Sequence, residues 1–149
     1  MTTVLAPVAG SVVGLAAVPD PVFAEGLVGP GTAIDPAREP GKVLAPIDGR
    51  ILKLHPHAYV IVGEDGRGVL VHLGIDTVQL RGEGFRLLAG EGERVRAGQP
   101  VVAWNPAAIE AGGRSPVCPV VALDARPGTV SAVVTAGPVR AGDRLLQWD

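Results

Sequence analysis

Histidine is the residue type that points most directly to chemistry in this sequence, and the chain contains only three, His55, His57 and His72. His72 interrupts the apolar run VLVHLGIDTV, residues 69–78, where another valine or leucine would be usual. An apolar surface disfavours a charged imidazolium, so we expect neutral rings. Because a neutral imidazole is a nucleophile or a metal ligand, two chemistries are open: phosphoryl transfer on one histidine, or zinc bound by all three.

A predicted hairpin decides where these histidines lie. Residues 57–75, HAYVIVGEDGRGVLVHLGI, are two apolar runs joined by EDGR, and Asp-Gly is the preferred centre of a two-residue type I′ turn. If Asp65 and Gly66 form that turn, Tyr59 pairs with His72 across the hairpin. A bulge at the turn would shift the pairing by one residue.

In this register the three histidines share one face of the sheet. Side chains alternate along a strand, so His57 lies on the same side as His72 and is its diagonal neighbour. His55, two residues earlier, lies on that side as well. We therefore expect all three histidines to gather on one surface, together with Ile61 and Leu70.

Two pairs of internal repeats indicate the fold that carries this surface. VLAPVAGSVVGL at residues 4–15 returns as VLAPIDGRILKL at residues 43–54, and VRAGQPVVAW at residues 95–104 returns as VRAGDRLLQW at residues 139–148. Each unit is typical of a strand, a glycine turn and a second strand. We predict an all-β protein, an antiparallel β-sandwich or flattened barrel made by internal duplication, with residues 1–149 forming a single domain.

Composition narrows the class of protein. The 149 residues are 47% hydrophobic, and the 21 glycines and 14 prolines fall between valine-rich runs, as turns in an all-β fold require. A net charge of −2 and an aromatic content of 3% argue against a nucleic-acid partner. The sequence shows neither a secretory signal nor an apolar run of about 18 residues, which predicts a cytoplasmic protein without membrane insertion. Residues 105–113 predict one short helix, and Cys118 is predicted to be structural.

The three histidines also suggest a zinc-dependent hydrolase. His55 and His57 form an H-x-H pair, and His72 would add a third ligand, leaving an open position for water as in peptidases of the lysostaphin type. A biotinyl or lipoyl carrier is a weaker alternative, because it needs a lysine at a hairpin tip. The only two lysines, Lys42 and Lys53, flank the second repeat instead.

Several motifs together resemble one known family. GVLVHLGIDTV at residues 68–78, followed by LRGEGF at residues 80–85, closely resembles the phosphorylation-site signature of the glucose-type enzyme IIA domain of the bacterial phosphoenolpyruvate-dependent sugar phosphotransferase system. VPDPVFAEGLVGPGTAI at residues 18–34 and HAYVIV at residues 57–62 also match, in order and at compatible spacing. The resemblance covers nearly the whole chain and implies a duplicated antiparallel β-sandwich that carries phosphoryl groups.

The resemblance implies a role for each site residue. His72 matches the phosphoryl-accepting histidine, which reacts through Nε2 while a backbone carbonyl near Gly74 holds Nδ1. His57 matches the second active-site histidine, which contacts the phosphoryl group, and His55 stands beside it where many members have a threonine. The implied donor is the phosphocarrier protein HPr, and the implied acceptor is the cysteine of a IIB sugar-permease domain.

A docking surface around His72 is also implied. Asp20 and Asp76 match acidic positions that meet a basic residue of the donor. Asp20 is equally suited to organising a turn, and Asp76 could also cap the local backbone, a role compatible with docking. We expect an exposed apolar rim formed by Val22, Phe23, Leu27, Val28 and Leu70; the alternative is that Phe23 and its neighbours are ordinary core. The role needs no cofactor, but it allows zinc at the pair His57 and His72 within a partner complex. The short stretch before the first repeat predicts no amphipathic amino-terminal tail, so membrane association would run through the permease.

Overall fold

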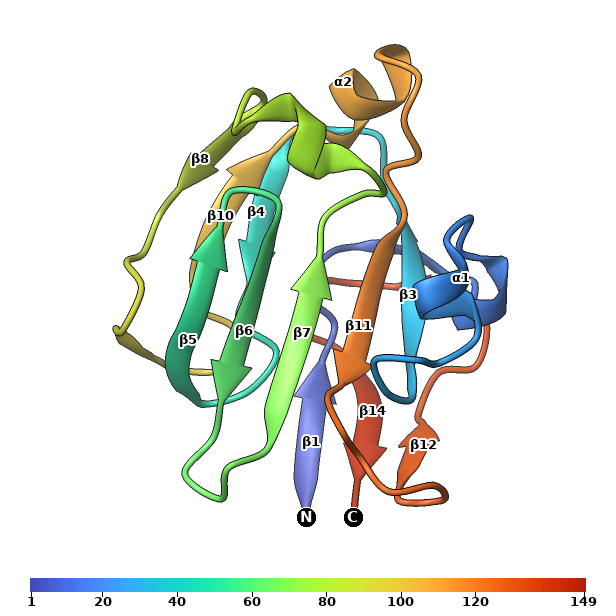
Figure 1. Ribbon diagram of the computed structural model, residues 1–149, viewed down its shortest axis with the longest axis vertical. Coiled ribbons are helices and arrows are strands. Elements are labelled where there is room, and N and C mark those ends of the chain that lie inside the picture. The colour runs from blue at the N-terminus through green and yellow to red at the C-terminus, as the bar shows by residue number, and fades with distance from the viewer.

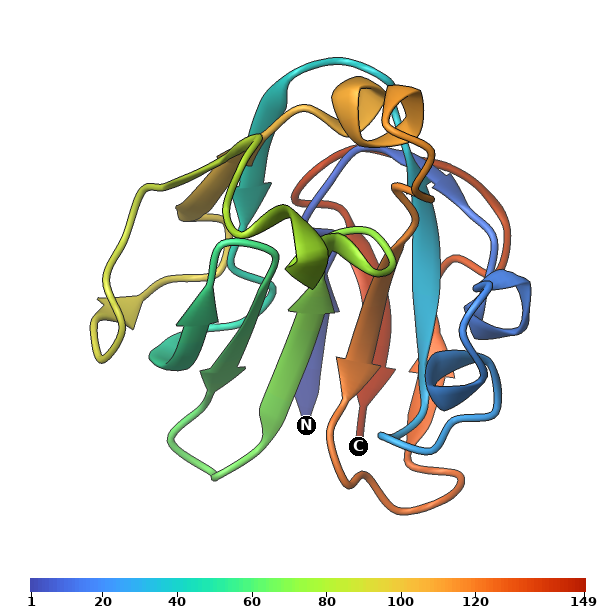
Figure 2. The same cartoon turned by 45° about the horizontal axis from the view of Figure 1, so that its top comes forward.

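The computed structural model describes residues 1–149 as fourteen strands, two short α-helices and two 3-10 helices. Figures 1 and 2 show the strands in layers that curl around a closed interior, with both chain ends at the same end of the molecule. Strand pairing is antiparallel throughout, which confirms the predicted all-β sandwich.

The strands form one large sheet and two small ones. The large sheet has the order β13 (Gly137–Val139), β2 (Gly10–Val12), β3 (Gly31–Pro36), β11 (Cys118–Ala122), β7 (Gly68–His72), β6 (Ala58–Val62), β5 (Gly49–His55) and β9 (Arg94–Val95). One small sheet has the order β1 (Thr2–Leu5), β14 (Arg144–Trp148) and β12 (Val130–Ala132). The other has the order β4 (Gly41–Leu44), β10 (Pro100–Trp104) and β8 (Phe85–Leu87).

The sequence repeats pair with each other in space. The first copy of one repeat, β1 and β2, pairs with β14 and β13, and its second copy, β4 and β5, pairs with β10 and β9 in the same way. Their backbone contacts are reciprocal: the amide of Leu5 donates to the carbonyl of Pro46 at 2.8 Å, and the amide of Leu44 donates to that of Pro7 at 2.9 Å. The two halves of the chain are therefore related by an approximate twofold axis, and the predicted duplication is confirmed.

The axis passes between β7 and β11, the two central strands of the large sheet. The amide of Leu73, just after β7, donates to the carbonyl of His57 at 2.7 Å, and the amide of Ala122, at the end of β11, donates to that of Pro30 at 2.9 Å. His57 and Pro30 thus occupy equivalent backbone positions.

Two hydrophobic clusters lie on opposite faces of the large sheet. The main core is a cluster of 26 buried residues enclosed between the sheets. It includes Cys118, where burial raises the pKa of the thiol and leaves it unreactive, so the structural role predicted for this residue is confirmed. A second cluster lies on the other face, which we call the outer face, and contains Val18, Phe23, Ala33, Ile75, Val117 and Val121.

Short helices lie in the connections between strands. η1 (Leu15–Ala17) and α1 (Pro21–Ala24) belong to the connection from β2 to β3, and Figures 1 and 2 show α1 against β3. η2 (Thr77–Leu80) follows β7, and α2 (Pro106–Ala111) follows β10. The side chain of Asn105 accepts from the amide of Ala107 at 3.1 Å and caps α2, which confirms the predicted short helix. None of the helices combines the length and the apolar character needed to cross a membrane.

The hairpin that leads to His72 differs from its prediction by one residue. β6 and β7 are joined by residues 63–67, and His72 pairs with Ala58 instead of Tyr59. The turn is longer than two residues because the amide of Gly63 donates to the carbonyl of Arg67 at 3.0 Å, and the amide of Arg67 donates to the Asp65 carboxylate at 3.0 Å.

This shift moves two side chains to the opposite face of the sheet. Tyr59 and Ile61 belong to the main core, so their predicted place beside His72 is wrong. The hydroxyl of Tyr59 donates to the carbonyl of Leu44 at 2.7 Å, which satisfies its buried oxygen. Leu70, two residues before His72, packs against the outer-face cluster as predicted.

Candidate functional site

His72 is held in one tautomer at the end of β7. Its Nδ1 lies 2.6 Å from the carbonyl oxygen of Gly74, and because a carbonyl can only accept, Nδ1 carries the proton. Nε2 therefore presents a lone pair. The chain bends after β7 at Gly74, which has a φ of 81°. A Cβ at this position would lie 2.6 Å from Cγ2 of Thr77, so the position requires glycine. The expected contact between His72 and the Gly74 carbonyl is confirmed.

His57 lies on a turn, not on a strand. β5 ends at His55 and β6 begins at Ala58, so Pro56 and His57 form the tight connection between them. The carbonyl of His57 accepts from the amide of Leu73, which fixes the turn next to the end of β7.

The three imidazoles form a short row. The rings of His57 and His72 lie edge to face with centroids 5.3 Å apart, and those of His55 and His57 stack at 5.7 Å. The predicted convergence of the histidines is confirmed, although the turn at His57 produces it instead of side-chain alternation along one strand.

Burial keeps both inner rings neutral near pH 7. Desolvation lowers the pKa of His57 to about 4, and the neighbouring rings of His72 and His55 add to the decrease. Desolvation also lowers the pKa of His72, while the Gly74 carbonyl and the carboxylates of Asp20 and Asp76 oppose that change. A neutral His72 with an unprotonated Nε2 is a nucleophile at physiological pH.

The ring of Phe23 packs against the ring of His72. The two ring centroids lie 5.1 Å apart, and Phe23 is 7% exposed within the outer-face cluster. The prediction of an exposed Phe23 is therefore wrong, because residues 13–30 fold back over the sheet and make this side chain part of a core. Its neighbour Val22 is 44% exposed on the same short helix.

The exposed apolar rim is narrower than predicted. Leu27 is 70% exposed, whereas Val28 and Leu70 are half-buried against the outer-face cluster. The structure adds Val78, 61% exposed on η2, which the sequence analysis missed. The available signal was its position directly after Gly-Ile-Asp-Thr of the signature, which places it close to His72 in sequence, because a single exposed apolar residue is otherwise common.

The two acidic residues differ in structural role. Asp20 caps α1, because its carboxylate accepts from the amide of Val22 at 2.9 Å, so the turn-organising role is confirmed. Asp76 is exposed with φ of 60°, and its side chain makes no capping bond, so its predicted capping role is wrong. Thr77 instead holds this loop, by donating from Oγ1 to the carbonyl of Leu73 at 2.7 Å.

Comparisons with known proteins point to one family. Residues 2–127 match the family described as phosphoenolpyruvate-dependent sugar phosphotransferase system, EIIA 1. The glucose-specific EIIA component of Bacillus cereus is 37% identical over 142 residues, which cover 91% of this chain and 85% of that protein. The glucose-specific EIICBA component of Staphylococcus carnosus is 37% identical over 145 residues, 96% of this chain but 21% of that protein. Glucose permease IIA from Mycoplasma capricolum has a similar structure, with a TM-score of 0.86, 31% identity, and coverage of 97% of this chain and 93% of that one.

The zinc-hydrolase alternative is not supported. Three ligands would have to aim at one point, yet His55 and His57 stack on each other, and no three His, Cys, Asp or Glu side chains are grouped so that they could hold a metal ion. The relatives found are sugar phosphotransferase components.

Proposed function

The chain belongs to the EIIA 1 family of the phosphoenolpyruvate-dependent sugar phosphotransferase system, and from this premise we propose that His72 carries the phosphoryl group. As a member it is a phosphotransferase component that works in a chain of phosphoryl transfers. The observation that carries the proposal is the contact from Nδ1 of His72 to the Gly74 carbonyl, which leaves Nε2 as the free nucleophile.

In the accepting step, Nε2 of His72 attacks the phosphorus of phosphohistidine on HPr. A phosphorus–nitrogen bond forms on His72 as the one on the donor breaks, and the donor imidazole leaves. In the second step the thiolate of a IIB cysteine attacks the same phosphorus, and the imidazole of His72 leaves. Such transfers need in-line positioning and electrostatic support for the equatorial oxygens, with little other covalent work.

His57 provides that support in this proposal. The centroids of its ring and the His72 ring lie 5.3 Å apart, edge to face, so we expect His57 to reach a group bound to Nε2. A neutral imidazole can donate one hydrogen bond to a phosphoryl oxygen, and that bond is charge-assisted. His57 then holds the phosphoryl group while the bond to His72 breaks.

Both partners dock on the same surface in this proposal. Asp20 and Asp76 lie close enough to His72 to change its pKa and would meet a basic group beside the donor histidine. The exposed Val22, Leu27 and Val78 would exclude water from the docked complex and so protect the labile phosphohistidine. Residues 1–149 act as one unit without a cofactor, and the reaction takes place in the cytoplasm, where phosphoenolpyruvate is made.

Reconstitution of the accepting step tests the proposal. The protein is incubated with phosphoenolpyruvate, enzyme I and HPr, and the adduct is mapped by mass spectrometry at mildly alkaline pH. We expect one phosphoryl group on His72, lost on treatment with acid and absent from His72→Gln. Labelling of the His72→Gln variant at the wild-type level would overturn the assignment. Unlabelled wild type with active enzyme I and HPr would overturn the function.

A further inference from the structure

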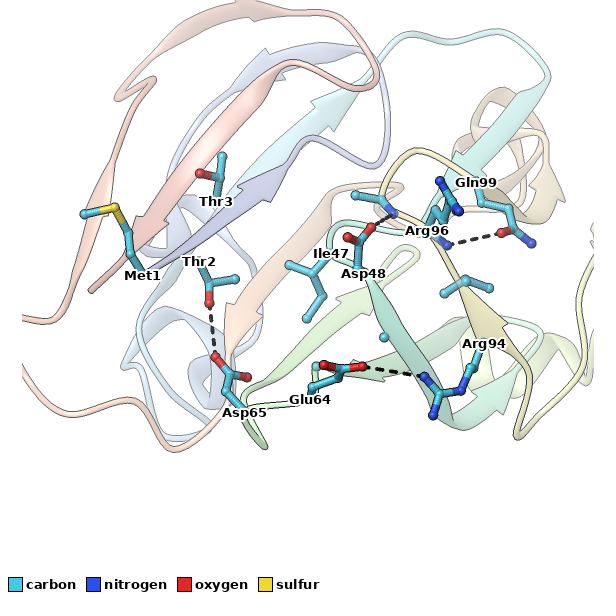
Figure 3. A pocket seen from close by; sticks show the side chains of 14 residues that line it. Met1, Thr2, Thr3, Ile47, Asp48, Glu64, Asp65, Arg94, Arg96 and Gln99 are labelled. Atoms are coloured by element: carbon cyan, nitrogen blue, oxygen red, sulfur yellow. Dashed lines mark hydrogen bonds and ion pairs between the residues drawn. The ribbon is translucent and has the colours of Figure 1, made fainter.

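A groove of about 1040 Å³ lies at the end of the molecule where β1 begins, lined in part by Met1, Thr2, Asp48, Glu64 and Arg94 (Figure 3). None of the residues of the histidine site lines it. The groove lies beside two sheet edges, because β1 pairs only with β14 and β9 pairs only with β5. An unpaired strand edge offers free backbone donors and acceptors to another extended chain.

The twofold axis shows what fits in such a groove. In the first half of the chain β3 ends at Pro36, and residues 37–40 lead directly to β4, which begins at Gly41. Gly10 pairs with Pro36 in the first half. Its repeat partner Gly49 lies opposite Gly63 in the second half, so Gly63 is the equivalent of Pro36. The repeat places Thr2 as the equivalent of Gly41.

The second half lacks the connection that the first half has. After Gly63 the chain turns back through residues 64–67 into β7 and does not cross to β1. Gly63 and Thr2 both line the groove, so the groove occupies the place where the equivalent of residues 37–39 would run. One half of the molecule therefore contains a filled version of a site that is open in the other half.

A backbone acceptor marks the same difference. In the filled half, the amide of Ala37 donates to the carbonyl of Ala9 at 3.0 Å. The repeat partner of Ala9 is Asp48, and no backbone or side-chain donor bonds to the carbonyl of Asp48. The groove therefore has a free acceptor where the filled half receives a peptide N–H.

Glu64 selects the side chain that would follow this amide, although it is not the counterpart of Asp35, whose equivalent in the second half is the uncharged Val62. In the filled half the next residue, Arg38, pairs with the carboxylates of Asp35 and Glu110 at 2.6 and 2.9 Å. In the groove, Glu64 is 93% exposed and its only ion pair is a 3.8 Å contact with the 73% exposed Arg94 (Figure 3). Such an exposed pair contributes little, so Glu64 is available to an incoming arginine.

We propose that this groove binds an extended segment of a partner polypeptide in which a small residue is followed by arginine. The amide of the small residue donates to the carbonyl of Asp48, and the arginine replaces Arg94 as the partner of Glu64. This binding is separate from phosphoryl transfer and does not depend on the proposed function of His72.

The chain's own connection supplies the probe. The peptide acetyl-Pro-Ala-Arg-Glu-Pro-amide, residues 36–40, is titrated into the ¹⁵N-labelled protein and followed by two-dimensional NMR. We expect saturable shifts in the amides of Thr2, Thr3, Gly49 and Glu64, with a dissociation constant in the millimolar range, and no shifts around His72. The same peptide with glutamate in place of arginine should bind about 3- to 5-fold more weakly, because charge reversal replaces an exposed attraction with a repulsion and such contacts contribute up to roughly 1 kcal/mol.

Paired variants complete the test. Glu64→Arg should weaken binding, whereas Glu25→Arg, the same charge change at an exposed residue of the α1 end, should not. Both sites are exposed, so both variants should fold, which the NMR spectrum itself reports. Absence of saturable shifts up to about 10 mM peptide, equal binding of the two peptides, or equal effects of the two variants would overturn the proposal. So would shifts on dilution without peptide, because they would show a second copy of the chain in the groove.

Discussion

His57 and His72 occupy one half of a nearly symmetric framework, and Pro30 and Val121 occupy the equivalent positions in the other half. The backbone bonds match on the two sides: the residue after His72 donates to the carbonyl of His57, and the residue after Val121 donates to that of Pro30. The framework therefore does not by itself make a site. The same backbone arrangement occurs twice, and only one of the two copies carries imidazole side chains.

The two halves also differ in the connection that covers these equivalent positions on the outer face. In the half with Val121, the connection from β2 to β3 runs through residues 13–30 and buries the outer face with η1 and α1. In the other half, the connection from β5 to β6 is only Pro56 and His57. The long connection reaches across the axis and places Phe23 against His72. One half supplies the support and the rim, and the other supplies the reacting groups.

Replacement of His57 should have the largest functional effect after loss of His72 itself. His57→Gln replaces the positioned imidazole N–H proposed to hold the phosphoryl group during release with the amide of a longer and more flexible side chain, but leaves Nε2 of His72 intact. We expect the variant to be labelled by phospho-HPr, whereas transfer to the IIB cysteine falls by about 100-fold or more, as for loss of a positioned catalytic donor. Rapid-quench assays of the two half-reactions separate these steps. Normal onward transfer would show that having His57 where the other half has Pro30 is not important for function.

Substitutions at Phe23 and Val22, two neighbouring residues of α1, distinguish a role in stability from a role in partner docking. Phe23→Asp places a charge in the outer-face cluster and should lower the free energy of unfolding by at least about 3 kcal/mol. Val22→Asp, on an exposed side chain, should change stability by less than about 0.5 kcal/mol but slow phosphoryl acceptance. Urea unfolding and the rate of labelling by phospho-HPr measure the two effects. Equal stability of both variants would place Phe23 on the surface after all.

The neutral histidines predict a pH dependence of stability. The pKa of His57 is lowered from 6.5 to about 4, so between these values the unfolded chain binds more protons than the folded one. Stability should therefore be complete above pH 6.5 and decrease as the pH falls from 6.5 towards 4. His57→Gln should lose less stability over this range than the wild type. Urea midpoints at pH 7 and pH 4.5 provide the comparison, and parallel losses in both proteins would contradict it.

The smallest effect is expected at His55, the outermost ring of the row. His55 is exposed and stacks only on His57, so His55→Thr should change both half-reactions by less than about 3-fold. We also expect the purified wild type to contain no stoichiometric zinc by elemental analysis. Stoichiometric zinc that is lost in His55→Thr together with a peptidase activity would restore the hydrolase alternative.

The sequence was sufficient for the framework but not for the orientation of every side chain in it. The repeats predict the strand pairs, since each copy keeps its glycine turn. The apolar run that contains His72 predicts the site. The register of the hairpin could not be predicted, because Asp65 favours a short turn by its type but bonds the amide of Arg67 in a longer one. That single residue of shift moves Tyr59 to the main core.

The burial of Phe23 could not be predicted for a different reason. An apolar residue two positions after a proline on a short helix fits a rim and a core equally well. Only the path of residues 13–30 over the outer face decides between them, and this path depends on contacts with β3 and β11 that are distant in sequence. The bend at Gly74 was expected only through the family resemblance, because nothing in the residue types alone specifies which carbonyl meets the ring.

The pairing of β1 with β14 sets an order for events at the ribosome. Of the fourteen strands β1 is synthesised first, but its partner β14 comprises residues 144–148, so β1 stays unpaired until those residues have emerged. The hairpins of β5, β6 and β7 need only residues 49–72 and can pair much earlier, because short loops close at lower entropic cost. The strands that carry the histidines therefore form while the polypeptide is still growing, and the molecule closes last at the end where its two termini meet.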